Sequence, residues 1–207
     1  MSPADSSKYF TPLKPVEAQF VVKHSRFIAW LISVTTRAAI DEALESRCKK
    51  FPDATHHCFA WRIGFDNKLQ AFSSDAGEPA GTAGKPILQA LGARHLTNTL
   101  CVVTRYFGGT KLGTGGLIRA YAAAAFAAIG QARLILVFPV TALRLSYDYV
   151  FAGAMEKVFH QIHARVRSQD FTDRITCLIE IHRDSVEPAC ALLKDASAGR
   201  LHLEIIS

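Results

Sequence analysis

The sequence predicts an α+β protein of two domains, divided near residues 131–138. Residues 1–134 carry 16 Lys/Arg and 9 Asp/Glu, whereas residues 135–207 carry 8 and 9, so the whole positive excess lies before the division. After it, apolar patterns of strand and helix type follow the order β-α-β-β-α-β, which is the ferredoxin-like arrangement. A chain of 207 residues is long enough for two small domains. The expected segments are a flexible stretch over 1–15, a basic domain over 16–134 and a near-neutral domain over 138–207.

The basic domain is expected to begin with two strands and a helix. Residues 17–34 alternate loosely and are rich in Val, Ile and Phe, which indicates two strands joined by a turn near His24–Ser25. Residues 36–51 place apolar side chains at helical spacing. Pro52 follows directly, where a helix is expected to end.

A strand is predicted over residues 55–65, and its alternation puts His56 and Cys58 on the same face. A histidine beside a cysteine allows a nucleophile with its base, or half of a metal site. Neighbours along one strand point outward side by side and rarely hydrogen-bond as a dyad, and no spacing supplies further ligands. We therefore keep a site at His56 and Cys58 only as the less favoured alternative, and we expect no metal.

The first of two glycine-rich segments, SSDAGEPAGTAGKPILQAL (73–91), follows a short predicted strand over 68–73. Proline is tolerated only in the first turn of a helix, whose N–H groups lack partners within the helix. Pro86 therefore predicts a helix that begins near Thr82–Lys85 and ends near Arg94. Thr82 is the expected N-cap.

The second glycine-rich segment, RYFGGTKLGTGGLIRAY (105–121), begins within a β-branched run over 98–107 that predicts a buried central strand. It leads into an alanine-rich helix expected from Gly115 to Ile129, with Thr114 as its cap. Alanine is the strongest helix former and its small side chain allows a helix to approach a sheet closely.

The near-neutral domain shows a regular succession of strand and helix patterns after a break near residues 130–133. The expected elements are a strand over 140–147, a helix over 149–162, strands over 164–169 and 174–182, a helix over 185–197 and a strand over 201–206.

The glycine-rich segments do not match the nucleotide-binding motifs. A P-loop ending at Gly84–Lys85 would need glycine at position 79 and Ser or Thr at position 86, and both positions hold proline. A dinucleotide-binding fingerprint that starts at Gly113 would need glycine where the sequence has Ile118. We therefore predict no ATP hydrolysis, no dinucleotide site and no cofactor.

Both glycine-rich segments lead into helix N-termini, where free N–H groups and the helix dipole favour anions. Lys85, Arg105, Lys111 and Arg119 lie in or beside these segments, which suits phosphate binding. The alternative is that the glycines only permit tight turns.

Glu78 allows two interpretations. It can act as a general base, or it can have a structural role as a helix cap or an ion-pair partner. The sequence shows no second acid as its partner, which favours the structural role.

Cysteine usage and hydropathy bear on the compartment. The five cysteines are scattered, without a CxxC pair, which is typical of free thiols in a reducing cytoplasm. The N-terminal residues lack the apolar run of a secretory signal. The apolar stretch 120–140 is interrupted by Gln131 and Arg133, so we expect no membrane span and a cytoplasmic location.

Four motifs together resemble the IMPACT/YigZ family. They are KHSRFIA (23–29), PDATHHCFAWRIG (52–64), SDAGEPAGTAGKPIL (74–88) and VVTRYFGGTKLGTGGLIRAY (102–121). The resemblance covers residues 15–130, and the remainder is similar to the ferredoxin-like C-terminal domain of the bacterial members. In one respect the sequence departs from the family, because Ala76 stands where a second acid usually follows Asp75.

The resemblance implies that the basic domain is a two-layer α/β unit of the ribosomal protein S5 domain 2-like type, similar to domain IV of elongation factor G. The second domain would be similar to domain V of that factor. Such units contact ribosomes and RNA, and the eukaryotic relatives regulate translation under stress by interfering with a kinase that acts on an initiation factor. Fold analogy alone is a weak argument for function.

The expected function is RNA or ribosome binding with a regulatory role in translation or stress response, and no residue is assigned as catalytic. The expected phosphate- or RNA-binding residues are Lys85, Arg105, Tyr106, Gly108, Gly109, Lys111, Gly113, Thr114, Gly115, Gly116 and Arg119. The family-motif loop contributes Asp75, Gly77, Glu78, Gly81, Thr82 and Gly84. Tyr106, Phe107 and Tyr121 are the candidate stacking residues, with at least one expected in the core instead.

Two other functions stay open. One is an enzyme that uses Glu78 and Asp75 on a small phosphorylated or nucleotide substrate. The other is a protein-interaction module whose near-neutral C-terminal domain docks a protein partner.

Overall fold

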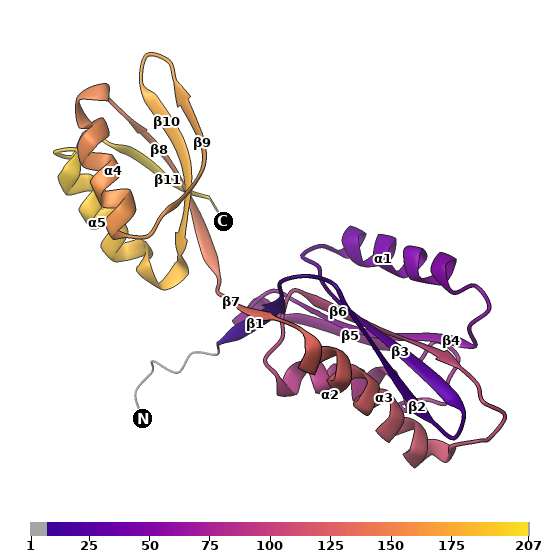
Figure 1. The fold of residues 1–207 in the computed structure, drawn as a ribbon. Coiled ribbons are helices and arrows are strands. Elements are labelled where there is room, and N and C mark those ends of the chain that lie inside the picture. The colour runs from indigo at the N-terminus through magenta and orange to yellow at the C-terminus, as the bar shows by residue number, and fades with distance from the viewer. Residues whose placement is uncertain (1–7, 207) are drawn as a thin grey trace, which may run out of the picture. The chain divides into compact units, whose positions relative to one another are not determined.

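The computed structural model describes residues 8–206. The chain divides into two compact units, and the boundary lies between Val137 and Phe138. Residues 1–7 of the expected flexible segment lie outside the described residues. The first unit is a five-stranded antiparallel sheet with helices on both faces (Figure 1). Within the described residues, no helix is long and apolar enough to cross a membrane.

The strands of this sheet lie in the order β2-β3-β6-β4-β5. Their bounds are Val16–Val22 (β2), Ser25–Ser33 (β3), His56–Ile63 (β4), Gln70–Ser74 (β5) and Thr99–Tyr106 (β6). Lys23 and His24 join the first two strands with positive φ angles of 45° and 61°, at the turn that the sequence predicts. β6 is the buried central strand, as its β-branched residues indicate.

One face of the sheet packs against α2 (Gly84–Ala93) and α3 (Gly113–Gln131), and the other packs against α1 (Arg37–Lys50) (Figure 1). Four alanines of α3, at positions 120, 124, 125 and 128, are buried against the sheet, so the helix lies close to it. Pro86 lies in the first turn of α2, as predicted. A 3-10 turn, η1 (Asp66–Lys68), separates β4 from β5.

The helix caps differ from the sequence prediction. α2 begins at Gly84 after Ala83, and α3 begins at Gly113 after Leu112, so neither Thr82 nor Thr114 is an N-cap residue. The Thr82 hydroxyl instead donates to the Pro79 carbonyl at 2.7 Å. At α2 the prediction was wrong because the Asp75 carboxylate, brought to the helix end by the fold, accepts from the N–H groups there. At α3 it was wrong because the helix begins at Gly113, one residue before Thr114.

A second, two-stranded sheet corrects the expected flexible segment 1–15. β1 (Tyr9–Pro12) pairs antiparallel with β7 (Leu134–Val137), which lies at the end of the first unit. Tyr9 is buried, and its hydroxyl donates to the Asp66 carboxylate at 3.1 Å. Residues 9–12 are therefore ordered by contacts made far along the chain, which local composition does not reveal.

The second unit, from Phe138, is a four-stranded antiparallel sheet in the order β11-β8-β10-β9. Its elements follow the predicted β-α-β-β-α-β succession, with both helices packed on one sheet face. They are β8 (Val140–Tyr147), α4 (Ala152–Gln161), β9 (Arg165–Phe171), β10 (Ile175–His182), α5 (Val186–Ala196) and β11 (His202–Ile206), with 3-10 turns η2 (Tyr149–Phe151) and η3 (Arg183–Ser185).

Candidate functional site

The Asp75 carboxylate occupies the N-terminus of α2. Its Oδ1 accepts from the backbone N–H groups of Ala83 and Gly84, both at 2.9 Å, and its Oδ2 accepts from Gly81 at 2.8 Å. Partial burial opposes ionisation, but these three hydrogen bonds outweigh it and lower the pKa of Asp75. The N–H groups that the sequence offered to a phosphate are therefore already used by a side chain of the same loop.

The glycines of this loop have backbone roles. A Cβ on Gly84 would lie 2.8 Å from the Ser74 backbone nitrogen, so only glycine lets α2 begin this close to β5. Gly77 and Gly81 have positive φ angles, and so does Ala76, which takes the place of the family's second acid. These glycines therefore permit the turns of this loop and its close approach to β5.

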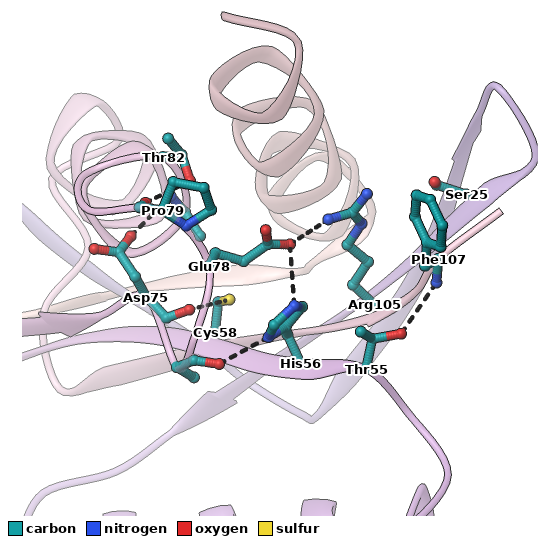
Figure 2. A network of polar contacts seen from close by, with 12 residues as sticks. Ser25, Thr55, His56, Cys58, Asp75, Glu78, Pro79, Thr82, Arg105 and Phe107 are labelled. Atoms are coloured by element: carbon teal, nitrogen blue, oxygen red, sulfur yellow. Dashed lines mark hydrogen bonds and ion pairs between the residues drawn. The ribbon is translucent and has the colours of Figure 1, made fainter. Parts of the chain in front are cut away.

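Glu78 is the centre of a buried polar network (Figure 2). Its side chain is 3% exposed, and Oε1 accepts from Arg105 Nη1 at 2.5 Å and from the Tyr121 hydroxyl at 2.7 Å. His56 Nε2 lies 4.0 Å from the same oxygen, while His56 Nδ1 contacts the Ala76 carbonyl at 2.9 Å. Glu78 is therefore an ion-pair partner, which is the structural role that the sequence favoured.

Cys58 lies beneath this network and does not pair with His56. Its Sγ is 2.9 Å from the Asp75 carbonyl oxygen and 3.3 Å from the Tyr121 hydroxyl. Burial raises the pKa of Cys58 to about 12, so the group stays a neutral thiol near neutral pH. Burial also raises the pKa of Tyr121, which is a core residue and not a stacking residue.

Arg105 does not present a free guanidinium to solvent. The side chain is 6% exposed and pairs with Glu78, and its Nε has no hydrogen-bond partner within the described part of the chain. Its guanidinium also lies near the rings of Phe27 and Phe107, at 5.4 and 5.6 Å from their centroids. The buried acid offsets the charge that was expected to meet a phosphate.

The two glycine-rich segments meet at a pocket of about 450 Å³. Glu78 and Pro79 line it from the first segment, and residues 111–114 line it from the second. Among the described residues, no side chain caps the α3 N-terminus at this pocket, unlike that of α2, and Lys111 and Thr114 are exposed beside it. The remaining lining residues are Thr55, His56, Arg105, Phe107 and Leu117.

A second hollow, of about 300 Å³, shares Leu112 with this pocket as a lining residue. Arg119 lines this second hollow together with Lys23, so the expected cations do not converge on one point. Phe20, Val22, Gly116, Ala120 and Ala123 complete its lining. Lys85 is exposed at the start of α2 and lines neither hollow.

The remaining predicted binding residues differ in their contacts and exposure. Tyr106 donates to the Asp53 carboxylate at 2.8 Å, and the Arg26 guanidinium lies 4.4 Å from its ring centroid. A Cβ on Gly108 would lie 2.1 Å from the His24 carbonyl carbon, so Gly108 serves close packing. Gly109 and Gly113 have positive φ angles, and Gly115 is exposed in the first turn of α3.

Sequence reasoning missed the residues that hold the second segment in place. Thr55 Oγ1 accepts from the Phe107 N–H at 3.2 Å (Figure 2). Ser25 Oγ accepts from the Gly108 N–H at 3.1 Å. Both come from strand ends adjacent to β6, so they would have been found only from the strand order. In the described residues 8–206, no three His, Cys, Asp or Glu side chains gather as metal ligands.

The expectation that the C-terminal unit docks a protein partner stays a prediction.

The chain resembles known proteins over nearly its whole length. Residues 23–129 match the model of the Impact N-terminal domain. The chain is 35% identical over 196 residues to the IMPACT family member YigZ of Escherichia coli (strain K12), across 94% of this chain and 96% of that protein. It is 42% identical over 188 residues to a Thermus thermophilus protein named as the IMPACT family member in the pol 5' region, across 89% and 99%.

A solved structure agrees with these similarities. A crystal structure described as that of a hypothetical protein matches with a TM-score of 0.71 and 34% identity, and the match covers 97% of this chain and 98% of that one. The Impact model spans more than half of the chain, and it includes both glycine-rich segments and the strands that hold them. By both its sequence and its fold, this chain belongs to the IMPACT family.

Proposed function

We propose that this protein binds RNA, free or within the ribosome, through its N-terminal unit and thereby regulates translation. The observation that carries the proposal is the uncapped N-terminus of α3 beside Lys111, at the rim of the pocket where the glycine-rich segments meet. Uncapped N–H groups and the positive end of the helix dipole favour phosphate oxygens. The first segment supplies the rigid wall of this pocket, because Asp75 has already fixed its backbone.

Charge and fold analogy support the same proposal. The positive excess of the chain lies in the N-terminal unit, and a basic surface attracts a polyanion over a distance of about the Debye length. We assign this unit to the ribosomal protein S5 domain 2-like type and the second unit to the ferredoxin-like type, whose strand order β11-β8-β10-β9 fits. Both assignments rest on analogy, and the regulatory role is carried over from the eukaryotic relatives.

The positions of the Asp75 and Glu78 carboxylates disfavour the enzyme alternative. Asp75 is used as the cap of α2, and its side chain points away from Glu78 (Figure 2). Glu78 is held by Arg105 and Tyr121 inside the unit. A general base must reach the proton that it abstracts, and neither carboxylate is free to do so in this arrangement.

The test is RNA filter binding and ribosome co-sedimentation across a salt series. Lys111→Ala should weaken binding and reduce the slope of log K against log salt by about 0.7, because one phosphate contact on a single strand is lost. Lys68→Ala is the matched control, since it removes the same charge from η1, beyond the opposite end of β4. Equal effects of the two substitutions, or no binding at low salt, would contradict the proposal.

A further inference from the structure

The surface around Leu112 carries two neighbouring hollows with a similar design. The first, of about 450 Å³, has Lys111 on its rim, and the second, of about 300 Å³, has Lys23 and Arg119. Both volumes fall in the range of about 300–1,000 Å³ typical of sites for small organic groups. Since Leu112 lines both, one continuous ligand can enter the two hollows across this side chain.

Each hollow combines an aromatic ring with positive charge. Phe107 lines the first and Phe20 lines the second. Of the described residues, none that lines the second hollow is acidic, and Glu78 is the one acid that lines the first, where Arg105 neutralises it. The pattern of an aromatic surface beside a cation suits a base next to its phosphate.

The backbone of Phe107 is anchored, and its ring is exposed beside the first hollow. Phe107 is 48% exposed although its side chain is large and apolar. Its backbone N–H donates to Thr55, and the buried Arg105 guanidinium lies 5.6 Å from its ring centroid. An exposed ring on a backbone that is already hydrogen-bonded binds a base at a smaller ordering cost than a ring on an unanchored loop.

We infer that the two hollows take adjacent unpaired nucleotides of a single-stranded RNA segment, with their phosphates passing the α3 N-terminus and Leu112. The inference rests on the proposed RNA-binding function and adds its substrate class. A duplex cannot use these hollows, because its bases are paired and stacked within the helix and only its outer edges reach a protein. A single strand can turn its bases outward into both.

The experiment compares a short unstructured RNA with a hairpin duplex of the same composition, by fluorescence anisotropy on the full chain. We expect the single strand to bind at least about tenfold tighter. Phe107→Ala should weaken single-strand binding about tenfold, within the range of about 1–3 kcal/mol reported per stacked base. Phe107→Trp should retain binding, since it keeps the aromatic surface.

Two further variants complete the test. Arg119→Ala should weaken single-strand binding and reduce the salt slope by about 0.7, as for one phosphate contact. Phe126→Ala is the control, since Phe126 is a 42% exposed ring on α3 that lines neither hollow, and binding should not change. Thermal melts of every variant report whether the fold is intact.

The outcomes separate this inference from the proposed function. Equal affinity for duplex and single strand, or full single-strand binding by Phe107→Ala while Lys111→Ala still weakens it, would overturn the inference and leave the RNA-binding proposal standing. Loss of binding in Phe126→Ala equal to that in Phe107→Ala would also overturn it. If the wild-type chain binds no RNA at low salt, both proposals fail.

Discussion

Arg105 and Glu78 form an ion pair inside the N-terminal unit, with Nη1 2.5 Å from Oε1 and both side chains less than a tenth exposed. The two residues come from β6 and from the first glycine-rich segment, so the pair joins the central strand to the loop that precedes α2. Tyr121 of α3 donates to the same oxygen. Three elements that are separate in the sequence thus meet at one carboxylate, which forms part of the pocket wall.

Glu78→Gln should reduce stability rather than abolish a reaction. Removing one partner of a buried ion pair leaves the other charge uncompensated, which costs about 3 kcal/mol. Urea unfolding of the full chain measures this loss in the first unit. Tyr121→Phe is the comparison, since it removes the neutral hydroxyl that donates to Glu78 and accepts from the Cys58 thiol but leaves the ion pair intact, and it should cost about 1 kcal/mol. Reproducible turnover of a phosphoester, nucleotide or peptide that Glu78→Gln abolishes would contradict the structural role.

Asp75→Asn should change how stability depends on pH. The folded-state pKa of Asp75 is lowered, so its stabilising contribution is fully present above the unfolded pKa of about 3.9 and is lost as pH falls through the lower folded value. The wild type should therefore lose more stability than Asp75→Asn between about pH 4 and acid. Urea midpoints measured over this range test the sign, and parallel curves for the two proteins would count against the capping carboxylate.

Gly108→Ala should destabilise the N-terminal unit, because the added Cβ would lie 2.1 Å from the His24 carbonyl carbon and 2.3 Å from the Ser25 nitrogen. Backbone atoms cannot move aside cheaply, so we expect a loss of about 2 kcal/mol or more. Gly130→Ala is the matched control, since nothing lies within 4 Å of its Cβ and it is in α3. That change should stabilise by up to about 1 kcal/mol. Thermal melts that rank the two variants in the opposite order would refute the close packing.

The N-terminal unit should fold alone when it includes β7. A fragment of residues 1–137 keeps the pairing of β1 with β7, whereas a fragment ending at residue 134 removes most of β7. We expect cooperative unfolding of both fragments, with the longer one more stable. Circular dichroism melts measure this. An aggregating fragment 1–137 without a cooperative transition would show that the two units depend on one another to fold.

Local patterns determined the elements and their order. Alternation predicted β4 and its two faces, the β-branched run predicted the buried β6, and Pro86 predicted the start of α2. These features depend on residues a few positions apart, whose side-chain spacing or backbone geometry is set within a single element. The motifs also sufficed to identify the family, because they are long and occur in a definite order.

Only the tertiary structure decided what each residue of the glycine-rich segments does. Asp75 and not Thr82 caps α2, since the turn between them brings the carboxylate to the helix end. Arg105 meets Glu78 instead of solvent, and Arg119 faces a different hollow from Lys111. β1 is a strand because residues 134–137 return beside it. Each of these contacts joins parts of the chain that become neighbours through the folded backbone and the strand order. Local periodicity in the sequence does not specify the strand order or the path of the folded backbone.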